Sequence, residues 1–286
     1  MKILLFSVLY ATSVYAWLIP TLIGGKPADP KDWPASVYAS MSGARCSATV
    51  IGERVLLIAA HCVSNGGTAS FSVGANNYTS KCTHSPYYKN NATSDWALCV
   101  TNNKVTGIPY ENVNQDEELF QVGDKLMLTG YGCIRAGGGG GNDGTYRIGE
   151  AVVRQKPSGT DNDIVTNSGA ALCFGDSGGP AFFINSENKR WVVSVNSRGN
   201  ISTTSYLSAV HTEQAKTFMK SWITTNSQDI CGISEKAVGC RDVKPPGKEF
   251  VIETEVVSLK GMVKNDFLDF YDNIVNVLKE FLGEFK

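Results

Sequence analysis

One histidine, one aspartate and one serine stand in stretches of sequence that suit them for shared chemistry. His61 ends the apolar run "LLIAAH", Asp95 begins "DWALCV", and Ser177 lies within "CFGDSGGP". A serine hydroxyl is a weak nucleophile at neutral pH, so it needs a base to accept its proton, and that base needs a carboxylate to orient it. The sequence therefore supplies one candidate for each role in nucleophilic hydrolysis, in the order His, Asp, Ser.

These stretches together resemble the signatures of the chymotrypsin/trypsin-like serine proteases. "AAHC", "DWAL" and "GDSGGP" occur in the family's order, and the resemblance covers roughly residues 22 to 225. It implies an all-β fold of two six-stranded antiparallel β-barrels with a cleft between them, His61 and Asp95 on the first barrel and Ser177 on the second. It also implies that Ser177 attacks a peptide carbonyl while the N–H groups of Gly175 and Ser177 form an oxyanion hole.

The elements that must position these residues can be predicted independently. Much of the chain consists of short β-prone runs such as "SATVIG", "KLMLTGYG" and "RWVVSVNS", separated by Gly, Asn, Ser and Asp. This pattern is typical of an all-β barrel or sandwich. A helix is predicted over residues 212–225, where Ala215, Phe218, Met219 and Trp222 recur at helical spacing.

Both ends of the chain differ from this central part. Residues 1–16 combine a lysine, an apolar run and a small-x-small end, as in a secretory signal peptide cleaved after Ala16. A buried helix or a membrane anchor is the alternative. We then expect a short propeptide at residues 17–21, a protease domain at residues 22–240, and a Pro-Pro-Gly linker with an amphipathic extension at residues 241–286.

The extension carries an apolar stripe at helical spacing, formed by Phe267, Phe270, Tyr271, Ile274, Leu278, Phe281, Leu282 and Phe285. Most helices of this kind dock on their own domain, and a partner or a membrane surface is the alternative. Acidic residues as well as lysines flank the stripe, so we do not expect it to bind a membrane.

Composition argues against several other classes of function. The formal net charge of -1 gives no basis for a nucleic-acid partner. Eight cysteines behind a secretory signal favour disulfides, and with 3 histidines and neither a C-x-x-C nor an H-E-x-x-H motif we expect no metal and no cofactor. The expected partners are protein or peptide substrates, an activating protease and protein inhibitors. We expect a monomer, secreted to an extracellular or periplasmic space.

Spacing alone leaves the connectivity of the cysteines open. The resemblance implies a disulfide beside the catalytic histidine, between Cys46 and Cys62. The other expected pairs are Cys82 with Cys99, Cys231 with Cys240, and Cys133 with Cys173. The last pair is expected because the family's usual partner for this cysteine lies near residue 200, where the chain has none.

The stretch "TLIGG" resembles the new N-terminus that the family exposes by cleavage. The resemblance implies a cut after Thr21, so that the freed amino group of Leu22 pairs with Asp176 and sets the oxyanion loop in working order. Thr21 is neither Lys nor Arg, so another kind of protease, or autocatalysis, is expected to make the cut. A turn that opens a strand is the alternative interpretation.

The resemblance also predicts a primary specificity pocket. Ala171 stands at the pocket floor, where an aspartate would select Lys or Arg, and the walls are expected from Ser194, Val195, Asn196 and Thr204. Asn196 and Thr204 replace glycines that the family usually has, so we expect a shallow, elastase-like pocket for small or medium uncharged residues before the cut.

Two other functions use the same residues. One is a catalytically inactive relative that serves as a binding protein, although its usual sign, a substituted triad residue, is missing from this sequence. The other is an esterase or amidase with the same triad, which selectivity for peptides over simple esters would separate from an endopeptidase.

Overall fold

The computed structural model of the protein describes residues 22–242. The predicted signal peptide, propeptide and apolar C-terminal stripe lie outside these residues. The elements are, in chain order, β1 (Lys26–Pro27), β2 (Ser36–Met41), β3 (Ala44–Gly52), β4 (Val55–Ile58), the 3-10 helix η1 (Ala60–Cys62), β5 (Thr68–Val73), β6 (Asn76–His84), β7 (Ala97–Thr101), β8 (Lys125–Gly130), β9 (Arg147–Gln155), β10 (Asp163–Gly169), β11 (Pro180–Ile184), β12 (Arg190–Gly199), β13 (Thr204–Ala209) and α1 (Glu213–Asn226).

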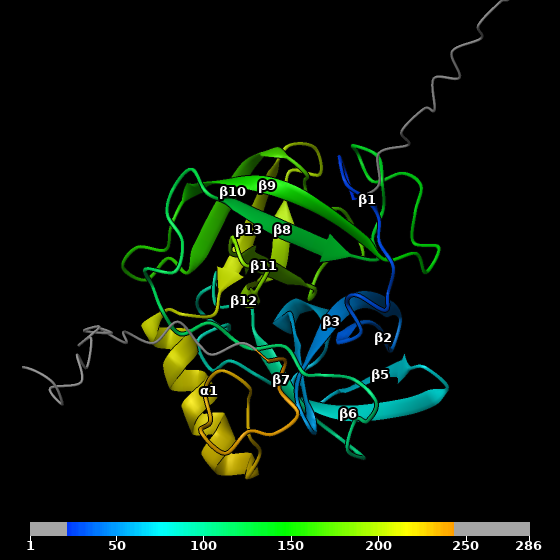
Figure 1. The fold of residues 1–286 in the computed structure, drawn as a ribbon, viewed down its shortest axis with the longest axis vertical. Coiled ribbons are helices and arrows are strands. Elements are labelled where there is room, and N and C mark those ends of the chain that lie inside the picture. The colour runs from blue at the N-terminus through cyan, green and yellow to red at the C-terminus, as the bar shows by residue number, and fades with distance from the viewer. Residues whose placement is uncertain (1–21, 243–286) are drawn as a thin grey trace, which may run out of the picture. The chain divides into compact units, whose positions relative to one another are not determined.

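The strands form two antiparallel barrels, drawn in blue to cyan and in green to yellow in Figure 1. The first barrel closes in the order β2-β3-β4-β7-β6-β5. The second runs β9-β10-β13-β12-β11-β8, and a further β8–β9 pairing closes it, while β1 pairs with Arg147 and Ile148 at the start of β9. The predicted pair of six-stranded barrels is confirmed.

Burial along the strands follows two patterns, alternation of buried and exposed residues in β6 and continuous burial in β4. In β6, Tyr78, Ser80 and Cys82 are buried while their sequence neighbours are exposed, because successive side chains point to opposite faces. In β4, by contrast, all four residues are buried, so both faces of this strand are covered. That strand leads directly into the segment that carries His61, so the backbone just before His61 is anchored in the core.

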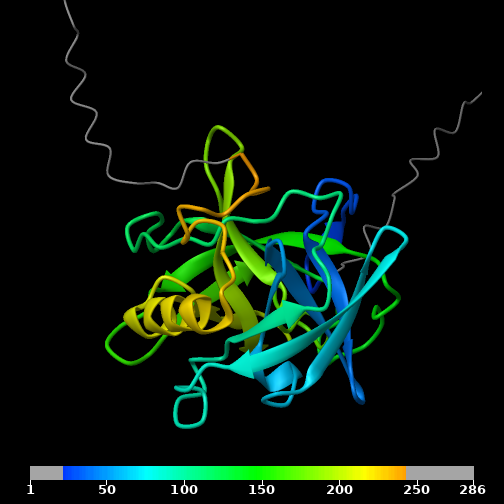
Figure 2. The same ribbon diagram turned by 90° about the horizontal axis from the view of Figure 1, so that it is seen from below.

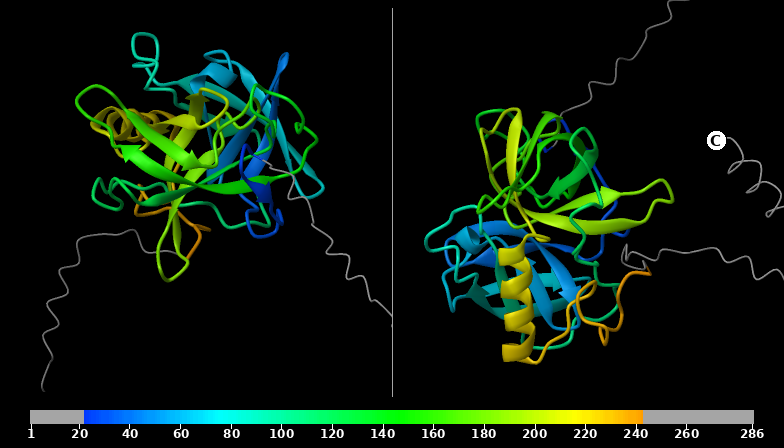
Figure 3. Two further views of the ribbon diagram at one scale, coloured as in Figure 1. Left: turned by 90° about the horizontal axis from the view of Figure 1, so that it is seen from above. Right: turned by 90° about the vertical axis from the view of Figure 1, so that its left-hand side faces the viewer.

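The predicted helix is also confirmed, as α1. Thr212 caps it by accepting a hydrogen bond from Ala215 N at 3.4 Å, and Ser227 ends it in the left-handed conformation. Its buried side chains, which include Phe218 and Trp222, join the same hydrophobic core as the strands of the first barrel. Figure 3 (right) shows α1, in yellow, running alongside that barrel although it follows the second barrel in sequence.

Candidate active site

His61 and Asp95 are brought together by strand pairing in the first barrel. β4 and β7 are antiparallel, with Ile58 opposite Ala97, so the residues just after β4 lie close to those just before β7. His61 Nδ1 lies 2.6 Å from Asp95 Oδ2, and His61 N donates to Asp95 Oδ1 at 2.9 Å. The imidazole is 37% exposed and the carboxylate 2% exposed, so the pair presents a histidine to solvent above a buried acid.

The carboxyl group of Asp95 stays ionised in spite of its burial. Burial by itself would raise its pKa, but hydrogen bonds from His61 and Ser197 outweigh that effect and hold the pKa below its ordinary value. Ser197 Oγ donates to Asp95 Oδ2 at 2.7 Å. A carboxylate held in this way fixes the orientation of the imidazole and stabilises its protonated form.

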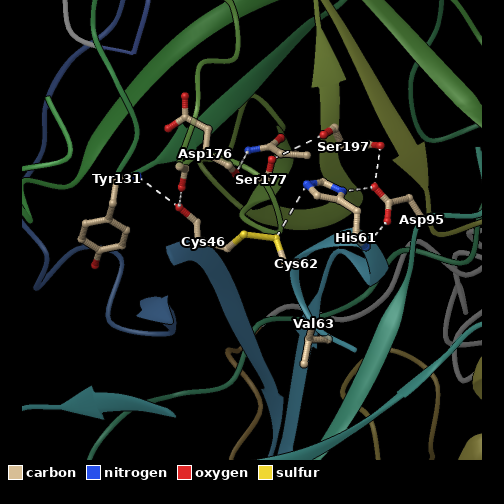
Figure 4. Close-up of a disulfide and its surroundings, with 12 residues drawn as sticks. Cys46, His61, Cys62, Val63, Asp95, Tyr131, Asp176, Ser177 and Ser197 are labelled. Carbon is tan, nitrogen blue, oxygen red and sulfur yellow. Dashed lines mark hydrogen bonds and ion pairs between the residues drawn. A yellow bond between two sulfur atoms is a disulfide. The ribbon is translucent and has the colours of Figure 1, made fainter. Parts of the chain in front are cut away.

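Ser177 comes from the loop between β10 and β11 of the second barrel. Its carbonyl accepts a hydrogen bond from Ser47 N of the first barrel at 2.8 Å. The next residue, Gly178, is so close to β4 that an added Cβ would lie 2.7 Å from Ile58 Cγ1. Because Ile58 is followed shortly by His61, these contacts place the serine beside the imidazole, as Figure 4 shows.

Ser197 of β12 connects the serine to the carboxylate. Its carbonyl accepts from Ser177 Oγ at 3.5 Å, while its own hydroxyl binds Asp95. The hydrogen bond that the Ser177 hydroxyl makes within residues 22–242 is thus to Ser197, and the imidazole Nε2 lies 3.8 Å from Cys62 Sγ. The three candidate residues gather at one place, with the serine hydroxyl turned toward the neighbouring strand.

In the turn before Ser177, the backbone amide of Gly175 is directed away from the loop that contains Cys133. Phe174 O accepts a hydrogen bond from Cys133 N at 2.9 Å, and because a trans peptide is planar, the Gly175 N–H points the opposite way. Gly175 has a φ of 101°, and an added Cβ would lie 2.9 Å from Gly132 Cα. Only glycine fits here without strain.

Asp176 is fully buried behind this turn. Its carboxylate accepts from Gly132 N and Cys173 N, both at 2.8 Å, and burial raises its pKa to about 7 in spite of these bonds. No ion pair to it exists within the described residues. Leu22 is also fully buried, in the apolar cluster of the second barrel, with a φ of 52°.

Ser194, Val195 and Asn196 do not form the pocket wall that we expect from the sequence, because the alignment of β12 is shifted by three positions. Ser194, Val195 and Asn196 are all buried, and Asn196 Nδ2 donates to the carbonyl of Thr129 at 2.8 Å, so this segment lies behind the site. The physical reason is an irregularity in the β12–β13 pairing between Asn196 and Arg198, which the sequence does not reveal. The residue that reaches the site is Ser197.

The signal that could have found Ser197 is the glycine two residues later. Ser197-Arg198-Gly199 keeps a glycine where the family usually has one, whereas starting at Ser194 requires replacing it by Asn196. Two serines in the run "SVNSRG" made both alignments possible.

The floor position and the far wall are apolar or internally bonded. Ala171 is fully buried, and its N–H donates to Ile23 O at 2.8 Å. Thr204 Oγ1 accepts from Asn167 Nδ2 at 3.0 Å. Neither of these two expected pocket residues is charged.

Arg198 is a second residue that the sequence analysis missed. Its guanidinium forms an ion pair with Asp163 and packs over the Tyr206 ring, 5.1 Å from the centroid. It also approaches the carbonyl of Ala92 at 3.4 Å, so it lies between the two barrels. Burial raises the pKa of Asp163 to about 6, and Arg198 opposes that rise.

Four disulfides join the pairs that the sequence analysis expects: Cys46–Cys62, Cys82–Cys99, Cys133–Cys173 and Cys231–Cys240. The third ties the loop that begins at Cys133 and contains the glycine-rich residues 136–144 to the turn of Ser177. Gly137 N of that loop donates to Ile201 O at 3.0 Å. Two sulfurs of the first disulfide lie within 4.8 Å of an imidazole nitrogen. Oxidised sulfur supplies no thiolate, so this grouping is not a metal site.

Comparison with known proteins gives concordant matches. A sequence model of the family described as Trypsin matches residues 22–223. The chain is 26% identical over 242 residues to "Trypsin, alkaline C" of Manduca sexta, a match that covers 72% of this chain and 91% of that protein. It is 25% identical over 213 residues to "Transmembrane protease serine 11G" of Mus musculus, covering 63% of this chain and 50% of the mouse protein. The chain thus spans about half the length of the mouse relative.

Within the described residues, no helix has the length and apolar character needed to cross a membrane.

Proposed function

Because the chain belongs to the trypsin family of serine proteases, we propose that it is a secreted serine endopeptidase that cleaves through an acyl-enzyme. Ser177 is the nucleophile, His61 the general base and then the general acid, and Asp95 the carboxylate that orients the imidazole. The observation that carries this proposal is the 2.6 Å contact between His61 Nδ1 and Asp95 Oδ2. The same carboxylate oxygen also accepts a hydrogen bond from the Ser197 hydroxyl.

The first chemical step requires a rotation of the serine side chain. The Ser177 hydroxyl faces Ser197 O at a long 3.5 Å, so little binding energy is lost when it turns toward His61 Nε2. Catalytic hydrogen bonds are often long in structures without substrate and tighten when substrate binds. His61 then takes the proton as Ser177 Oγ attacks the carbonyl carbon, and returns it to the departing amine.

The negative oxygen formed in that step is received by backbone amides. Gly175 N–H points away from its bonded neighbour Phe174 O, and we assign the second donor to Ser177 N–H. One such donor typically lowers the barrier by about 2.7–4 kcal/mol. Water attack on the acyl-enzyme, with His61 again as base, completes the hydrolysis.

For specificity we propose small or medium uncharged residues before the scissile bond. Ala170, Ala171 and Leu172 form a buried apolar floor, and an aspartate that would attract Lys or Arg is missing from it. Thr204, with its hydroxyl bonded to Asn167, narrows the far side. Asn196 plays no part in this, since it lies behind the site. One methylene changes discrimination by only about 1–3 kcal/mol, so the preference should be broad.

For regulation we propose activation by cleavage after Thr21. Leu22 is already buried in the second barrel, and Asp176 is a buried carboxyl without a cationic partner among the described residues. The ammonium group freed at Leu22 would supply that partner and fix the turn that carries Gly175. Another protease, or the enzyme itself, makes the cut, and protein inhibitors would act on the resulting enzyme. The four disulfides fit an extracellular location.

One experiment tests reaction class and specificity together. The protein, processed to start at Leu22, is treated with a fluorophosphonate probe and separately with a peptide library. We expect covalent labelling of Ser177 and cleavage after Ala, Val, Thr or Leu, with both abolished in Ser177→Ala. Cleavage of simple esters without peptides would indicate an esterase instead, and a correctly folded protein that does neither would indicate a binding protein.

A further inference from the structure

A groove of about 860 Å³ lies between α1 and the loop that follows β6. Figure 2 shows α1, in yellow, beside this loop, in blue-green. Phe218 and Trp222 of α1 form one wall, and Pro86, Tyr87 and Tyr88 of the loop form the other. None of His61, Asp95 and Ser177 lines it.

The large side chains of the lining are aromatic, uncharged polar residues such as Thr217 and Ser221 fill much of the rest, and the charge on the lining is positive. Lys89 is its one fully charged side chain among the described residues, and no Asp or Glu lines the groove. The indole N–H of Trp222 is buried in the wall without a hydrogen-bond partner in the described chain. Such a groove fits an amphipathic segment with large apolar side chains and acidic edges.

The chain itself contains a segment of that chemistry beyond Asp242. The apolar stripe between residues 267 and 285 consists of two sets with spacing i, i+3, i+4, i+7, which is the anchor pattern of a helix in a groove. The first set is Phe267, Phe270, Tyr271 and Ile274, and the second is Leu278, Phe281, Leu282 and Phe285. Asp269, Asp272, Glu280 and Glu284 outnumber Lys279 and Lys286 beside them.

We propose that residues 267–285 dock as an amphipathic helix in the groove between α1 and residues 84–89, with acidic side chains near Lys89. The connection over residues 243–266 spans up to about 80 Å when extended, at about 3.3 Å per residue, so any face of the domain is within reach. A tethered segment also competes at a high effective concentration against a second copy of the chain. The proposal does not depend on the catalytic role of Ser177.

The test measures backbone amide hydrogen exchange in the protein processed to start at Leu22 and extending to Lys286, the form that is expected to label with the fluorophosphonate probe. In the parent protein we expect slow exchange in residues 270–282 and in residues 87–89. Ser221→Asp, which places a charge at an exposed position on the groove wall, should speed exchange in both segments at least tenfold. Phe270→Asp with Ile274→Asp should do the same from the side of the extension.

Thr224→Asp is the matched control, because it adds the same charge to an exposed position of α1 outside the groove lining. It should leave both segments protected, and all variants should label with the fluorophosphonate probe at the parental rate. Exchange in residues 270–282 that Ser221→Asp does not change would overturn the proposal. Protection that rises with protein concentration would also overturn it, and would assign the groove to a second copy.

Discussion

At the scale of single residues, Ser197 is the side chain whose contribution can be isolated most cleanly. Its hydroxyl donates one of the hydrogen bonds that keep the pKa of Asp95 low. Ser197→Ala should therefore raise that pKa and leave the Asp95 carboxylate less firmly placed to orient His61. A hydrogen bond to a charged group is worth about 1.5–3 kcal/mol, which corresponds to a loss in kcat/KM of roughly tenfold or more.

Ser194→Ala is the control for that prediction. It makes the same chemical change three residues earlier in β12, at a fully buried hydroxyl that has no hydrogen-bond partner within the described residues. Its kcat/KM should stay within about twofold of the parent. A large loss for Ser194→Ala with none for Ser197→Ala would restore the alignment first drawn from the sequence.

How far sequence predicts the site depends on whether a residue's signal is local. His61, Asp95 and Ser177 each stand in a distinctive local stretch, and the structure gathers them at one place. Ser197 has an ambiguous local signal, because the run "SVNSRG" contains two serines and the irregularity in the pairing of β12 with β13 at this point is not visible in the sequence. The Arg198–Asp163 ion pair joins positions 35 residues apart, and nothing local to either residue indicates it.

At the scale of elements, the turn from Cys173 to Pro180 carries the two proposed oxyanion donors, Gly175 N–H and Ser177 N–H, and requires glycine at position 175. Gly175→Ala would need a left-handed φ of 101° and would bring its Cβ within 2.9 Å of Gly132 Cα, so the turn must shift. Loss of one oxyanion donor should lower kcat by about 10²–10³-fold, measured by steady-state kinetics on a peptide substrate.

Gly144→Ala serves as the comparison, because Gly144 also has a positive φ but open space around its Cβ position. It should lower the melting temperature slightly and leave kcat unchanged. Equal effects of the two substitutions on kcat would mean that strain, and not the geometry of the turn, accounts for the loss.

The elements themselves were predictable, since strand runs and helical spacing are local, whereas barrel closure by β8 and β9 required the family resemblance.

At the scale of the whole molecule, the two barrels contribute different members of one site, and the proposed N-terminal cut should change how the stability of the fold depends on pH. In the uncut chain Asp176 has a pKa of about 7 instead of 3.8, so the folded state binds a proton that the unfolded state releases. Stability contributed by this group is therefore present below pH 4 and is lost as pH rises to 7, by on the order of 4 kcal/mol.

If the proposed cut frees the Leu22 ammonium to pair with Asp176, the carboxylate should stay ionised in the cut chain, and that loss should not occur. Urea unfolding of Ser177→Ala protein, cut and uncut, should show a stability difference that widens from pH 5 to pH 7.5. It should narrow again once the amine loses its proton, above about pH 8. Buried His211, whose pKa is lowered to about 4, titrates in both forms and cancels in the difference. Parallel pH profiles for the two forms would show that the freed amine does not reach Asp176, and would leave the activation step without its physical basis.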